Sequence, residues 1–273
     1  YAIERFLYRL GDSPAASRCV LKGAALLAAW LSAPYRTTRD VDFLATGAQD
    51  DDGIRRIIEE ACAIECPDDA VRYDLTGLKI ESIRNEEEYS GKRATFAAYL
   101  GKALIRVQVD FGFGDAMTIA PIVIEYPTML DHLPKARIRG YARETTIAEK
   151  FEAAVKLGTT NSRMKDFHDI WGLSGAFAFD GAVLQPAVVA CFDRRGTRWP
   201  AETPSALTAA FYADPTMQAK WAGYARKNSV AVAPAGQFGE IGEQITTFLR
   251  PIRDSIASNT SFHLNWPAGG PWK

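Results

Sequence analysis

Asp40 and Asp42 stand one residue apart in the stretch RTTRDVDFL, with Arg36 and Arg39 beside them. Alternate residues of a strand point to the same face, so this spacing predicts two carboxylates on one face. Two such carboxylates could share or bridge hard divalent cations, which prefer oxygen ligands. Cations of this kind neutralise charge on phosphate oxygens during phosphoryl or nucleotidyl transfer. Exposed strand ends also carry acid pairs for structural reasons, so the pair needs support from its surroundings.

A glycine turn upstream of the acid pair gives the first support. SRCVLKG is typical of a short strand, and Gly23 then opens an Ala- and Leu-rich helix that should end before Pro34. Backbone can approach a phosphate closely at glycine, and a helix N-terminus favours anions. We therefore expect Gly23 and Ala24 to bind nucleotide phosphates. Arg39 is predicted to join them, although bracing of the acid pair is an equal alternative for both arginines.

A third carboxylate is predicted on a neighbouring strand. LKIESIR, KRATFAAYL and ALIRVQVDF indicate consecutive strands of an antiparallel meander, preceded by a helix over 52–63. In the last strand the apolar residues alternate with polar ones, which leaves Asp110 on the polar face. Asp110 is thus a third carboxylate on a polar strand face. APIVIEYP adds one more short strand.

The second half of the chain is expected to be helical. Thr146 and Glu149 have the spacing of a capping box, which predicts a helix beginning near Ile147. Another helix should begin near Ser162 and carry Asp166 and Asp169 on its flank. A third repeats apolar residues at helical spacing over 238–252, and Pro251 is expected to kink or end it. The pattern favours an α+β fold, with a mixed sheet and flanking helices over 1–140 and a mostly helical domain over 141–273.

Composition excludes several classes of protein. The chain has 273 residues, 47% of them hydrophobic and 24% charged, which is ordinary globular usage. The net charge of -1 provides no overall basic face for nucleic acid. Four cysteines are too few for a disulfide scaffold, and no G-x-G-x-x-G follows the first strand, which sets a Rossmann dehydrogenase aside. The longest apolar stretch is too short to span a bilayer, so we expect a cytoplasmic protein without a membrane partner.

The glycine turn, the Asp-x-Asp strand and the later Asp strand together resemble the nucleotidyltransferase superfamily, whose pattern is a G-[GS] turn, h-D-h-[DE]-h and a third acid. Further blocks resemble the AbiEii/AbiGii-type, MenT-like nucleotidyltransferase toxins: LKGAAL, IEYPTMLDHLP, ETTIAEKFEAAVKLG and NSRMKDFHDIW. They cover roughly the first two thirds of the chain. The family often has Gly or Ser where this chain has Ala24, which leaves only backbone donors for phosphate there.

The resemblance implies roles for particular residues. Asp40, Asp42, Lys150 and Asp166 would be catalytic, and Lys150 would also contact the nucleotide phosphate. Asp40, Asp42 and Asp110 would hold Mg²⁺. Without the resemblance, Lys150 could be a lysine that snorkels from its helix, and Asp166 could pair with a nearby lysine.

The resemblance also implies an activity. An enzyme of this kind takes an NTP, transfers its nucleoside monophosphate to an acceptor hydroxyl and releases pyrophosphate. The implied acceptor is RNA, specifically the 3′ end of tRNA, with blocked translation as the consequence and a cognate antitoxin as partner. The near-neutral charge suits a small-molecule acceptor at least as well. Transfer to a protein, and a non-catalytic protein that only binds nucleotide, are also compatible with the sequence.

Overall fold

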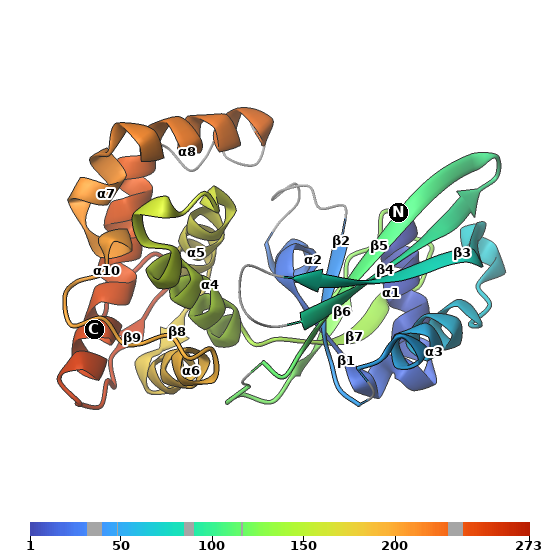
Figure 1. Ribbon diagram of the computed structural model, residues 1–273, viewed down its shortest axis with the longest axis horizontal. Coiled ribbons are helices and arrows are strands. Elements are labelled where there is room, and N and C mark those ends of the chain that lie inside the picture. Colours follow the sequence, from blue (N-terminus) through green and yellow to red (C-terminus); the bar gives the residue numbers. More distant parts are fainter. Residues whose placement is uncertain (32–39, 48, 85–89, 116, 229–236) are drawn as a thin grey trace. The chain divides into compact units, whose positions relative to one another are not determined.

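The computed structural model describes residues 1–31, 40–47, 49–84, 90–115, 117–228 and 237–273 (Figure 1). Its internal contacts divide the chain into two compact units. The first unit comprises Tyr1–Trp30, Thr37–Asp115 and Ala120–Tyr141, and the second consists mainly of Ala142–Lys273. Each unit has a buried apolar core of its own. Within the described ranges, no helix combines the length and the apolar character needed to cross a membrane.

The first unit is built on a mixed sheet of seven strands in the order β3-β4-β5-β2-β1-β7-β6. Strands β3, β4 and β5 form an antiparallel meander, and β2 joins it in parallel with β5. Strand β1 is antiparallel to β2 and parallel to β7, which pairs antiparallel with β6. The bounds are β1 Cys19–Lys22, β2 Asp40–Ala45, β3 Val71–Arg84, β4 Ser90–Leu100, β5 Ala103–Phe113, β6 Ile122–Tyr126 and β7 Ala136–Gly140.

One face of this sheet forms the core of the unit. Figure 1 shows helices α1 (Ala2–Asp12) and α3 (Asp51–Cys62) lying together beside it. Phe43 and Phe111 are neighbours on paired strands with ring centroids 5.9 Å apart, and Phe6 of α1 packs on Phe96 at 5.5 Å. Since side chains alternate along a strand, the residues next to Phe43 and Phe111 in the sequence point to the opposite face. That opposite face therefore carries Asp40, Asp42 and Asp110.

A buried ion cluster fixes α1 to the start of β3. Arg9 donates to both carboxylate oxygens of Asp69, at 2.6 and 3.0 Å, and Arg5 donates from Nε at 3.1 Å. The backbone N–H of Val71 donates to the same carboxylate at 2.9 Å. The Asp69 side chain has no exposed surface, so this charge depends entirely on these partners.

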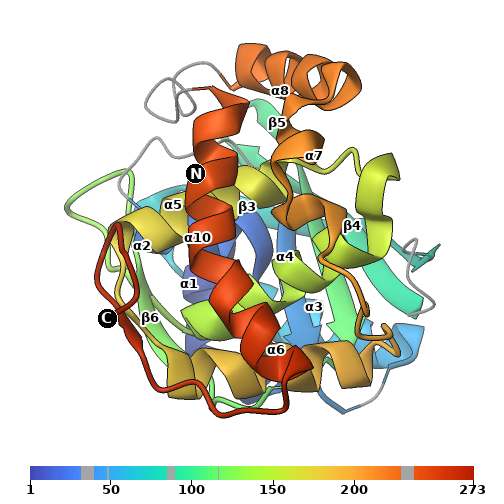
Figure 2. The same cartoon turned by 90° about the vertical axis from the view of Figure 1, so that its left-hand side faces the viewer.

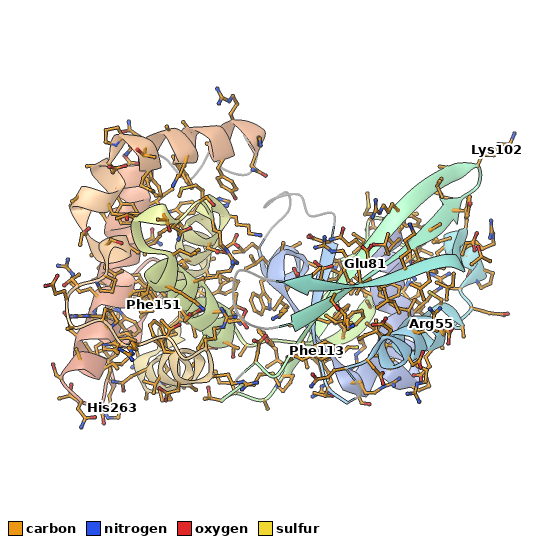
Figure 3. All side chains as sticks on the ribbon, viewed as in Figure 1. Arg55, Glu81, Lys102, Phe113, Phe151 and His263 are labelled. Atoms are coloured by element: carbon orange, nitrogen blue, oxygen red, sulfur yellow. The ribbon has the colours of Figure 1, made fainter. Side chains whose placement is uncertain are left out.

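The second unit is mainly helical. Figure 2 shows α10 crossing the other helices of this unit, and contacts of α10 with α5, α6 and α7 agree with that view. Its core is aromatic: Phe151 of α4, marked in Figure 3, is fully buried and lies 5.7 Å from Phe192 between ring centroids. The bounds are α4 Arg143–Leu157, α5 Met164–Ala176, α6 Gly181–Arg194, α7 Ala209–Ala213, α8 Pro215–Lys227 and α10 Phe238–Ala257.

The C-terminal tail is docked on this unit. A two-residue strand, β9 (Asn265–Trp266), pairs with β8 (Phe179–Asp180). Trp266 donates from its ring nitrogen to the Ser174 carbonyl at 2.7 Å, and Trp272 donates to the Phe248 carbonyl at 2.8 Å. Both indole donors are therefore satisfied by helix carbonyls.

The expected α+β fold with a mixed sheet and flanking helices is confirmed, as is the antiparallel meander. The expected start of the first helix of the second unit is wrong. Helix α4 begins at Arg143, one turn before Ile147, and its N-cap Ala142 makes no side-chain capping bond. The Thr146 hydroxyl lies inside the first turn and donates to the Ala142 carbonyl at 3.3 Å, so the expected capping box does not form.

Of the two alternatives for Pro251, an end of the helix is excluded, because α10 continues past it to Ala257. Proline removes one backbone donor from a helix. Phe248, Leu249 and Ile252 are all buried around that position, and their packing holds the helix together.

Candidate active site

The turn between β1 and α2 (Gly23–Trp30) brings the backbone against the acid pair. Gly23 has φ +70°, a left-handed conformation that side chains disfavour. A Cβ on Gly23 would lie 2.1 Å from Oδ2 of Asp42, far inside any real contact. Glycine is therefore required at this position both by its backbone conformation and by the carboxylate beside it. The expected strand, glycine turn and helix are confirmed here.

Charged side chains form a row across the sheet on the face opposite α1 and α3. In the pairing register, Lys22 of β1 is the partner of Asp42, Asp42 is the partner of Asp110, and Asp110 is the partner of Arg93 on β4. Directly paired residues of neighbouring strands point to the same side. The register thus places Asp42 and Asp110 side by side, with one cationic residue on each flank. Asp40 stands on the same face, two residues before Asp42.

Arg93 binds Asp110 with both arms of its guanidinium. Nε donates to Oδ1 at 2.8 Å and Nη2 donates to Oδ2 at 2.7 Å, a bidentate geometry. With its amide oxygen turned toward the guanidinium, Gln108 accepts from Arg93 Nε at 3.1 Å. The hydrogen bond to Asp110 is the largest influence that raises the pKa of Arg93, and the charges of Asp40 and Asp42 raise it further. All three carboxylates therefore act on this one guanidinium.

Lys22 has carboxylate and aromatic partners at the other end of the row. Its ammonium forms an ion pair with Oδ2 of Asp115, which also accepts from the Tyr141 hydroxyl at 3.0 Å. A Cβ on Gly112 would lie 3.2 Å from Lys22 Nζ, so a side chain there would crowd the ammonium. The Lys22 side chain keeps 18% of its surface exposed.

Lys150 and Asp166, predicted from separate helices, contact each other in the second unit. Lys150 Nζ donates to Oδ1 of Asp166 at 3.0 Å and to Oδ2 of Asp169 at 2.6 Å. Arg163 donates from Nε to Oδ2 of Asp166 at 2.7 Å. Asp166 and Asp169 are both buried. Burial alone would raise the pKa of Asp166, but the charges of Lys150 and Arg163 hold it below its ordinary value.

The chain was compared with known proteins. The family model for the nucleotidyl transferase AbiEii toxin of type IV toxin-antitoxin systems matches residues 5–244. The chain belongs to the AbiEii family. Crystal structures of two Helicobacter pylori proteins resemble this AbiEii protein in fold. No curated protein matches the chain significantly.

The two solved structures share the fold at low sequence identity. JHP933 aligns with a TM-score of 0.52 at 14% identity, over 94% of this chain and 91% of its own. A candidate nucleotidyltransferase aligns with a TM-score of 0.51 at 13% identity, over 96% of both chains. The AbiEii protein is accordingly a nucleotidyltransferase of a toxin family, and that family implies an NTP substrate and an antitoxin partner.

The acid pair of this AbiEii protein suits a magnesium ion. Asp40 and Asp42 offer hard oxygen donors beside a backbone turn that leaves no room for a side chain. Mg²⁺ is often bound by one or two carboxylates together with substrate phosphates. In the part of the chain that the structure describes, no group of three acidic, histidine or cysteine side chains is arranged to hold a metal. A site completed by a nucleotide fits both observations, and Asp110 as a ligand stays a prediction.

Sequence reasoning gave no site role to several charged residues of these clusters, among them Lys22, Arg93 and Asp169. Lys22 and Arg93 are significant only through the strand register, which joins segments far apart in the chain. Asp169 is significant only through the packing of α5 on α4. Arg36 and Arg39, which were expected near the acid pair, lie outside the described residues.

Proposed function

We propose that this AbiEii protein transfers a nucleoside monophosphate from an NTP to an RNA acceptor, with the 3′ end of tRNA as the acceptor, and so blocks translation. The observation that best supports transfer chemistry is the contact of the Asp42 carboxylate with the Gly23 turn, with Asp40 on the same face. It places paired carboxylates beside a helix N-terminus, where nucleotide phosphates are favoured.

The acid pair and the turn have separate roles in this proposal. Asp40 and Asp42 would hold Mg²⁺, which when bound supplies charge neutralisation at the phosphate oxygens. The backbone N–H groups at Gly23 and Ala24 donate to the phosphates, and this use of the backbone needs no hydroxyl at position 24. Arg39 is proposed as a further phosphate contact. Asp110 is proposed as a third ligand, and its orientation depends on Arg93.

Lys150 and Asp166 are proposed as catalytic residues of the same reaction. Lys150 keeps about a tenth of its side chain exposed and is oriented by two carboxylates. An ammonium with fixed direction is suited to stabilise developing phosphate charge. Its dependence on Asp166 means that substitutions of either residue must be judged together with protein stability.

The experiment is a labelling assay with each of the four radiolabelled NTPs, Mg²⁺ and total RNA. Label in the RNA fraction, at the 3′ end of tRNA, is the expected result. Label in the protein or small-molecule fraction would instead identify one of those acceptors. Binding of NTP without turnover would contradict the proposal that the protein transfers a nucleoside monophosphate.

The site assignment is tested in the same assay with Asp42→Ala, which should abolish transfer while the chain stays folded by circular dichroism. Asp131→Asn is the matched control, because it removes an exposed carboxylate from the loop after β6 and should leave transfer unchanged. Normal transfer and metal dependence in Asp42→Ala would contradict the assignment.

A further inference from the structure

Arg93 holds a carboxylate of the acidic face, and its effect on the cation site goes beyond orienting that one group. It lies on β4, in register with Asp110 of β5, and holds both oxygens of that carboxylate. The Asp110 side chain is 12% exposed and the Arg93 side chain is 35% exposed, so the guanidinium is more accessible to water than the carboxylate. A fork of this geometry fixes the direction of the carboxylate as well as its charge.

The position of Asp110 makes this contact important. It is the Cα partner of Asp42, so its carboxylate is the nearest in-register candidate to join the acid pair as a third cation ligand. A carboxylate held by both arms of a guanidinium is less available to a metal, because its direction is fixed and its charge is already partnered. Both Asp110 oxygens accept from Arg93, so a cation has to compete with the guanidinium for this carboxylate.

We infer that Arg93 is a positioning residue that ties down Asp110 and so keeps the cation site of Asp40 and Asp42 weak when no nucleotide is bound. The inference rests on the proposed function, since it takes the acid pair to be the metal site. Affinity of an oxygen-ligand site depends on the number of charged ligands that reach the ion. While Asp110 stays with Arg93, the cation has two carboxylates rather than three and depends on the substrate phosphates to complete its ligand set.

The consequence is an order of binding. A divalent cation should enter this site together with NTP rather than before it, and the free protein should bind the metal only weakly. Removal of the guanidinium should release the Asp110 carboxylate to the acid pair. The free protein would then bind metal by itself, which can be measured without any enzyme turnover.

The test is Mn²⁺ binding to the full chain without nucleotide, followed by the loss of the electron paramagnetic resonance signal of free Mn²⁺. Mn²⁺ shares the oxygen-ligand preference of Mg²⁺. Arg93→Gln should tighten binding about tenfold, in line with one added charged ligand. Arg93→Gln/Asp110→Asn should lose this gain, because no carboxylate is then released.

Two controls separate the possible outcomes. Lys79→Gln removes an exposed positive charge from β3, two residues before Glu81, which is the register partner of Arg93 and is marked in Figure 3. This substitution should change the Mn²⁺ affinity less than about twofold, because solvent and salt screen a charge at this distance. A gain in Lys79→Gln as large as that in Arg93→Gln would assign the effect to net charge and overturn the inference.

Asp42→Asn completes the set. If it abolishes Mn²⁺ binding while Arg93→Gln binds no tighter than the native chain, the metal site stands and the inference about Arg93 is wrong. If Asp42→Asn binds Mn²⁺ as well as the native chain does, the metal assignment itself fails, and the inference fails with it. No detectable binding in Arg93→Gln would also overturn the inference. Melting curves for every variant ensure that affinities are compared between folded proteins.

Discussion

Gly23→Ala gives the sharpest test of the turn beside the acid pair. The substitution has two separable effects. The left-handed backbone, with φ +70°, costs a residue with a Cβ about 1–2 kcal/mol of folding stability. The new methyl group would also lie 2.1 Å from Oδ2 of Asp42, where real Cβ contacts hardly ever fall below 3.0 Å.

The second effect should dominate the activity. To relieve the overlap, the Asp42 carboxylate has to move by about 1 Å, and a displacement of that size at a reacting centre costs roughly a hundredfold in rate. We therefore expect nucleotide transfer to fall about a hundredfold, measured as labelled NMP incorporated per minute under saturating NTP. Stability should fall only by the backbone term, measured by urea denaturation.

Gly101→Ala is the matched control for the backbone effect. Gly101 has φ +59° in the turn between β4 and β5, and a Cβ there would meet nothing within 4 Å. It should lose similar stability, about 1–2 kcal/mol, and keep its transfer rate. If Gly23→Ala retains transfer to within a few fold of Gly101→Ala, the contact between turn and carboxylate has no part in the reaction and the reasoning is refuted.

Three further predictions concern stability. Asp69→Asn should cost about 3–5 kcal/mol in urea denaturation, because it leaves buried arginines without their carboxylate. Burial alone would raise the Asp69 pKa, but the Arg9 hydrogen bond holds it below its ordinary value. The stability that this carboxylate contributes should be present at neutral pH and be lost as the pH falls below about 3.9. An equally steep loss of stability at low pH in Asp69→Asn would contradict this. Lys150→Met should cost about 3–5 kcal/mol by removing the cation that two buried carboxylates share, and a melting temperature equal to that of the native chain would count against this. On α10, Gly242→Ala should lose about 1–3 kcal/mol of folding stability because its Cβ would lie 2.3 Å from the Tyr212 ring. Gly239→Ala, whose Cβ would meet nothing within 4 Å, should gain up to about 1 kcal/mol. Equal urea midpoints for the two variants would refute the packing argument.

What could be predicted from the sequence was local. The shared face of Asp40 and Asp42 follows from strand alternation alone, and the register confirms it. The glycine turn before a helix also depends only on neighbouring residues, and φ +70° at Gly23 bears this out. The meander was visible because each strand alternates and ends at turn residues.

What could not be predicted depends on contacts between distant segments. Arg93 and Asp110 are 17 residues apart, and only the β4–β5 register makes them a pair. The start of α4 was misplaced because Thr146 and Glu149 have a capping spacing, whereas burial of Thr145 and Thr146 extends the helix by a turn. Helix α1 was missed, although Ala2, Phe6 and Leu10 recur at helical spacing and are all buried.

The row across the sheet shows how folding and chemistry compete for the same charges. Carboxylates on directly opposed residues of neighbouring strands repel, and Asp42 and Asp110 stand in that relation. Arg93 offsets the repulsion by ion pairing with Asp110, and Lys22 adds a cation on the other flank of Asp42. A group that neutralises a carboxylate for folding also competes with any cation that needs the same oxygens. The stability of the empty sheet and the strength of its cation site are therefore opposed, and the guanidinium of Arg93 is the group at which the two demands meet.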